Sequence, residues 1–153
     1  MTIRLSTGLR NAMLGAVGFK GALLNGVIYV YTGAQPLLAD NAVSGTLLGK
    51  ITVDAGAFSF GTSTNGLNFD APALGVITKA AAEDWKFNGI ADGTAGWFRF
   101  MGNVSDALGS STTLARMDGS VGTSGADLNL SNIAIVTGAP NTVDVFQVTL
   151  PAQ

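Results

Sequence analysis

Short runs of β-branched and aromatic residues, separated by glycine-containing turns, recur from about residue 26 to the end of the chain. The run Val27–Tyr31 is apolar at every position and stops just before Gly33, which is typical of a strand buried on both faces. Leu47, Ile51 and Val53 alternate with polar residues, which indicates a half-buried antiparallel strand. This period of two restricts the chain to a β fold.

The same alternation predicts further short strands in the second half. A hairpin is expected where the Trp85 and Phe87 strand is followed by the Asp92-Gly93 turn pair and a returning strand. The stretch 119–125 has turn chemistry and predicts a loop. Apolar positions change parity after Val145, so the last strand either buries both faces or contains a bulge. The other strands are expected around 58–60, 67–69, 95–101, 114–117, 128–130, 133–135 and 142–150.

A helical pattern occurs only near the start. Leu9, Met13 and Val17 recur every four residues, and Ser6 or Thr7 could cap the first turn, which predicts a short helix over 7–17. We therefore expect an all-β protein: an N-terminal arm or helix over residues 1–25, then one antiparallel β-sandwich or jelly-roll-like domain over 26–153.

Composition favours association over charge-driven binding. Only 12% of the 153 residues are charged, whereas an ordinary domain has about 25%, and 47% are hydrophobic. A chain with so little charge tends to associate, so we expect a homo-oligomer or a permanent partner. The eight lysines and arginines are scattered and the net charge is −2, which argues against nucleic acid. No apolar run is long enough to predict a membrane span.

Catalytic and metal-binding chemistry has few candidates. The chain has neither histidine nor cysteine, which excludes a Ser-His-Asp triad, a Cys-His pair and zinc sites built on either residue. Glu83 and Asp84 are adjacent acids, which are expected to be solvated and not to form a catalytic pair. Asp118 and Asp127 flank the glycine-rich stretch, so a calcium site is an alternative to simple turn chemistry there. We assign no catalytic residue, metal or cofactor, and expect no enzyme activity.

The aromatic residues allow two interpretations. Trp85, Trp97, Tyr29 and Tyr31 belong either to the core or an oligomer interface, which is the favoured reading, or to a sugar-stacking platform.

Several segments resemble small virion structural proteins of tailed bacteriophages. They are IRLSTGLRNAML, IYVYTGAQPLLADNAVSGTLL, DGTAGWFRF, DGSVGTSGADLNLSNIAI and the closing VTLPAQ. The resemblance spans most of the chain, but its motifs carry no chemistry. The segment 80–90, with its acidic and aromatic run, departs from the family pattern.

The resemblance implies a virion protein made in the host cytoplasm and located on the capsid surface. Its expected role is decoration or cementing of the head, with the major capsid protein and further copies of itself, for example in a trimer, as partners. A tail or fibre-associated module and a carbohydrate-binding module are the alternatives. We expect the N-terminal segment, residues 2–24, to contact the shell or a neighbouring copy. The candidate interface residues are Leu5, Leu9, Met13, Val17, Trp85 and Phe87.

Overall fold

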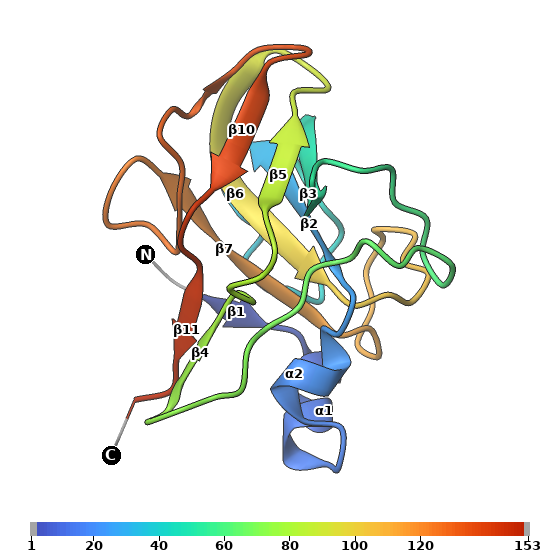
Figure 1. The fold of residues 1–153 in the computed structure, drawn as a ribbon. Helices are drawn as coiled ribbons and strands as arrows, with labels where there is room; N and C mark the ends of the chain where they lie inside the picture. Colours follow the sequence, from blue (N-terminus) through green and yellow to red (C-terminus); the bar gives the residue numbers. More distant parts are fainter. Residues whose placement is uncertain (1–2, 152–153) are drawn as a thin grey trace.

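The fold was analysed in a computed structural model that describes residues 3–151 (Figure 1). Two short helices precede nearly all of the strands. The elements in chain order are β1 (Arg4–Leu5), α1 (Thr7–Leu14), α2 (Gly18–Ala22), β2 (Val27–Thr32), β3 (Leu47–Val53), β4 (Val76–Thr78), β5 (Trp85–Asn88), β6 (Gly93–Met101), β7 (Arg116–Gly122), β8 (Leu128–Asn129), β9 (Ala134–Ile135), β10 (Pro140–Val143) and β11 (Gln147–Thr149).

One large sheet dominates the architecture. Its strands run in the order β1-β7-β6-β2-β3-β5-β10, with β8 added to β7 and β9 added to β6, while β11 and β4 form a separate two-stranded sheet. The pairings between these strands are antiparallel except that of β7 with β8. The prediction of an antiparallel all-β fold with a short N-terminal helix is therefore confirmed, and the jelly-roll topology stays a prediction.

The N-terminal segment packs onto the large sheet. Within the predicted arm over 1–25, Arg4 and Leu5 pair with Asp118 and Met117 of β7. Leu9 of α1 is fully buried in the same core as the strands. The strand β1 thereby supplies one edge of the large sheet.

The predicted helix over 7–17 is present but ends three residues early, and a second short helix that was not predicted follows it. The Ser6 hydroxyl accepts a hydrogen bond from the Leu9 N–H at 3.1 Å, so the expected N-cap is present. The helix α1 ends at Leu14, and α2 starts at Gly18 with φ 69°, a left-handed value that favours glycine. The chain therefore changes direction between Leu14 and Gly18 and forms α2 beyond the end of the predicted helix.

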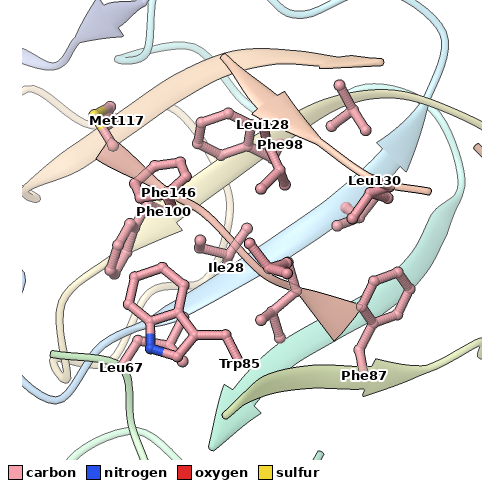
Figure 2. Packing of buried hydrophobic residues seen from close by; sticks show 14 of the residues in the cluster. Ile28, Leu67, Trp85, Phe87, Phe98, Phe100, Met117, Leu128, Leu130 and Phe146 are labelled. Atoms are coloured by element: carbon pink, nitrogen blue, oxygen red, sulfur yellow. The ribbon is translucent and has the colours of Figure 1, made fainter. Parts of the chain in front are cut away.

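The core lies on one face of the large sheet and also contains Ile77 of β4 and Val148 of β11. Figure 2 shows part of this cluster. Trp85 is at its centre, with its ring edge-on to Phe69 at 5.9 Å and to Phe100 at 6.0 Å between centroids. Phe146 packs against Trp85 at 5.6 Å and Phe98 at 5.7 Å. Such edge-to-face pairs add about 0.5–1.5 kcal/mol each beyond area burial, so this cluster is a main source of stability.

The predicted hairpin around Asp92-Gly93 is wrong. Both strands exist, but β5 pairs with β3 and β10, whereas β6 pairs with β2 and β7. Asp92 instead accepts hydrogen bonds from the Thr137 N–H at 2.7 Å and hydroxyl at 2.8 Å, and this lowers the pKa of Asp92. The predicted turn is absent as well, since Gly93 is the first residue of β6 and neither Asp92 nor Gly93 has a positive φ. The two strands pair instead with segments far along the chain.

The predicted last strand over 142–150 is split. Val143 ends β10 and Phe146, just before β11, enters the core, while Val145 between them is 69% exposed. After Val143 the chain leaves the large sheet and pairs with β4. The shift of apolar residues from odd to even positions therefore marks a break between two strands in different sheets.

The predicted loop over 119–125 is partly a strand. Residues 119–122 belong to β7, opposite the central strand β6. A Cβ at Gly119 would lie 2.6 Å from the Phe98 ring, so glycine is required there by packing and not by a turn.

Two other strand predictions need correction. Thr52, expected on the solvated face of β3, is fully buried, and its hydroxyl donates to the Gly56 carbonyl at 2.7 Å. Phe58 and Phe60 lie in a loop, where they pack on the second face of the large sheet.

Candidate functional site

Three of the six candidate interface residues are in the core. Leu9, Trp85 and Phe87 are all fully buried, and the Trp85 Nε1 donates a hydrogen bond to Glu83 at 2.8 Å. The Phe87 ring fills the space above Gly49, where a Cβ would be 2.1 Å away. Their prediction as interface residues is wrong, because all three side chains belong to the hydrophobic core.

The other three candidates are nearer the surface. Leu5 and Met13 are half-buried against the core, whereas Val17 is 61% exposed. Val17 also lines a surface groove beside α2. Of the four N-terminal candidates only Val17 is exposed, while two residues that were not candidates, Leu14 and Leu24, are exposed at 90% and 55%.

This helix-side groove runs between α2 and the β4–β11 sheet, at the end of the molecule where the helices lie (Figure 1). Its volume is about 320 Å³. The lining is apolar except for the charged ammonium group of Lys20. The lining residues are Val17, Gly18, Phe19, Lys20, Pro72, Gly75, Val76, Ile77, Val148 and Leu150.

A tight turn before β4 forms one rim of the helix-side groove. The N–H groups of Ala73 and Val76 each donate to the other's carbonyl at 2.9 Å, and both residues between them have positive φ. This turn leaves Leu74 at its tip, fully exposed. On the opposite rim, Phe19 of α2 packs against Phe69 of the core at 5.6 Å, which holds the helix in place.

An exposed leucine at a strained turn has no packing role in the monomer. Leu74 has φ 52°, a conformation that costs a non-glycine residue free energy, and Leu150 beside it is 56% exposed. Contiguous exposed apolar surface around a groove is the feature that marks protein contact sites. The helix-side groove therefore suits an apolar surface, and Lys20 is the ionisable side chain among its lining residues.

The second face of the large sheet carries a buried ion pair that the sequence analysis missed. Arg99 Nε and Nη2 donate to the two carboxylate oxygens of Asp118, each at 2.7 Å, and both side chains are fully buried. Arg99 Nη1 also donates to the Asn41 carbonyl at 3.0 Å. The sequence contained one sign of this burial. Side chains two apart in a strand share a face, so Arg99 lies on the same face of β6 as the apolar residues Trp97 and Met101.

A second buried pair lies nearby on the same face. Arg116 Nε and Nη2 donate to Asp106 at 2.6 and 2.5 Å. The two acids that were considered for a calcium site have partners within the protein. Asp118 pairs with Arg99, and Asp127 accepts hydrogen bonds from the Ser120 N–H and hydroxyl. No group of three or more acidic side chains lies close enough to hold a metal ion within residues 3–151.

Neither tryptophan presents a ring to solvent. Trp97 is fully buried on the second face, stacked on Tyr31 at 4.7 Å between centroids, and loop residues Phe58 and Phe60 pack against this cluster. Burial raises the pKa of Tyr31 well above its ordinary value. The geometry therefore lacks the exposed aromatic platform that sugar stacking by Trp85 and Trp97 requires.

We expect the intrinsic tryptophan fluorescence to be insensitive to iodide in the native protein. Both indoles are fully buried, so an aqueous quencher cannot reach them. Stern–Volmer titration in buffer and in denaturant measures this, with the unfolded chain as the accessible control. Strong quenching of the native protein would mean that an indole is exposed.

Comparison with known proteins gives no relative: no family model, curated protein or solved structure matches the chain. Within the described part of the chain, neither helix is long and apolar enough to cross a bilayer.

Proposed function

We propose that this protein is a structural component of a bacteriophage virion that binds at junctions between major capsid subunits and strengthens the head. Binding through apolar contact is supported by the helix-side groove, around which Val17, Leu74 and Leu150 are exposed. The virion assignment is supported by the sequence resemblance described above. In this role the protein acts through buried contact area.

Apolar contact of this kind is strong enough for cementing. Complete burial of one leucine side chain yields about 1.5–3 kcal/mol, so the exposed residues of the groove together can support a stable contact. A protein that binds the assembled shell but not free subunits stabilises the shell by mass action, and many copies multiply the effect. Location on the capsid exterior and self-association belong to the same proposal.

Reconstitution of stripped particles tests this function. Particles lacking the protein are expected to lose DNA at a lower temperature than complete particles, and added wild-type protein should restore their resistance. The variant Leu74→Ser should restore it poorly, since it removes apolar area from the groove rim. A dye-release melting curve of the particles measures the effect.

The matched control is Leu37→Ser, because Leu37 is 80% exposed but does not line the helix-side groove. It should behave like wild type. Equal resistance of stripped and complete particles would contradict the cement role, and density for the protein on the tail in a particle reconstruction would contradict the capsid location.

A further inference from the structure

A second groove lies beside β11; Val148 of this strand and Leu150 just after it line the helix-side groove. This strand-edge groove has a volume of about 620 Å³ and separates β11 from the segment that contains β8. Its lining residues are Ile3, Thr123, Ala126, Asp127, Asn129, Leu130, Ser131, Asp144, Val145, Phe146, Gln147 and Thr149.

The main chain of β11 faces this groove with unused hydrogen-bonding groups. Lys79 N–H donates to the Phe146 carbonyl and Leu150 N–H to the Gly75 carbonyl, each at 2.9 Å, and Val148 is opposite Ile77. Even-numbered residues of the strand therefore bond to β4. In an antiparallel pair the intervening residues point their N–H and C=O groups the other way. Within residues 3–151, β11 pairs with β4 alone, so Gln147 and Thr149 present these groups to the groove.

The opposite wall is also a strand edge. The Leu130 N–H donates to the Gly122 carbonyl at 2.9 Å, which directs the main chain of the preceding Asn129 away from β7. Asn129 is exposed and lines the groove. The groove is thus bordered on both sides by backbone that could bond to an inserted strand.

All charged side chains that line the strand-edge groove are acidic. Its lining contains Asp127 and Asp144, and no lysine or arginine. Asp144 is exposed and forms no ion pair with any residue that the structure describes. Val145, which is 69% exposed, adds apolar surface to this lining, while Leu130 and Phe146 are buried. A complementary ligand is extended, partly apolar and basic.

We propose that the strand-edge groove binds an extended segment of a partner protein, which adds to β11 as a strand and places a lysine or arginine beside Asp144. Main-chain hydrogen bonds to Gln147 and Thr149 supply affinity, and the acidic and apolar side chains of the groove supply specificity. The inference is independent of the virion assignment, because any protein partner with such a segment satisfies it.

A pair of synthetic peptides tests this binding mode. The first is a capped peptide of alternating valine and lysine, and the second has glutamate in place of lysine. Titrated into the ¹⁵N-labelled full chain, the lysine peptide should shift the amide signals of Gln147, Thr149 and Asn129. The glutamate peptide should bind about tenfold more weakly, since two like charges would face the groove.

Two variants separate backbone pairing from charge. Thr149→Pro removes an N–H that faces the groove and not β4, so it should abolish peptide binding while the β4–β11 pairing remains. Asp144→Asn keeps the shape of the side chain and should weaken binding of the lysine peptide about threefold, as expected for an exposed charge pair. The control Asp84→Asn alters an exposed acid that does not line the groove and should have no effect.

Three results would overturn the proposal. They are no saturable binding of the lysine peptide, equal affinity for both peptides, or shifts confined to the helix-side groove. Failure of the particle experiment with successful peptide binding would reject the cement role alone.

Discussion

Replacing Asp118 with alanine is expected to lower the free energy of unfolding by about 3–5 kcal/mol. The substitution leaves the guanidinium of Arg99 fully buried without the carboxylate that accepts its two 2.7 Å hydrogen bonds. The buried charge has lost its hydration and keeps only the hydrogen bond from Nη1 to the Asn41 carbonyl. Since domains are stable by only about 5–15 kcal/mol, this is a large share of the total. Urea denaturation followed by far-UV circular dichroism measures it.

The control for this prediction is Asp84→Ala. Asp84 also pairs with a cation, Lys86 at 3.1 Å, but its side chain is 71% exposed, so its loss should change stability by less than about 1 kcal/mol. The double variant Arg99→Met with Asp118→Leu should recover most of the loss, because it removes both charges together. An Asp118→Ala protein with the wild-type denaturation midpoint would contradict the buried pair.

Replacing Trp85 with alanine is the second change with a large expected effect, about 3–5 kcal/mol of lost stability. The indole is fully buried and packs against Phe69, Phe100 and Phe146, so its removal leaves a cavity that the sheet cannot close. It also takes away the Nε1 donor bonded to Glu83. Guanidinium denaturation measures the loss.

Leu74→Ala is the matched control, because it also truncates a large apolar side chain but at a fully exposed position. It should change stability by no more than about 0.5 kcal/mol. Similar stabilities for the two variants would mean that Trp85 is at the surface, as its prediction as an interface residue required. The comparison therefore separates core from contact surface by a stability measurement alone.

Local pattern was sufficient for the type of most elements. The pleat of a strand places successive side chains on opposite faces, so alternation of apolar residues is visible in the sequence itself. Val27–Tyr31 was predicted as a strand buried on both faces, and all its residues are buried in β2. A cap at Ser6 or Thr7 was predicted for an equally local reason, since a cap involves only the next three residues, and Ser6 fills that role.

Local pattern could not assign functional surfaces. An apolar side chain in a strand has the same pattern whether it lies in a core or on a contact face, so Trp85 and Phe87 were placed wrongly. The helix-side groove depends on α2 meeting β4 and β11, segments more than 50 residues apart in the chain. The strand-edge groove depends on which edge of β11 remains unpaired, which no single segment contains.

The sequence by itself determined the all-β class, the position of the N-terminal helical region and the residue chemistry of the chain, because these follow from spacing, turn residues and composition. Only the tertiary structure decided that β5 and β6 are not a hairpin, that the last strand divides between two sheets, and that Arg99 and Asp118 are buried together. Those outcomes depend on strand pairing between distant segments. The free energy of such pairing is set by the packing of whole faces and not by any local run of residues.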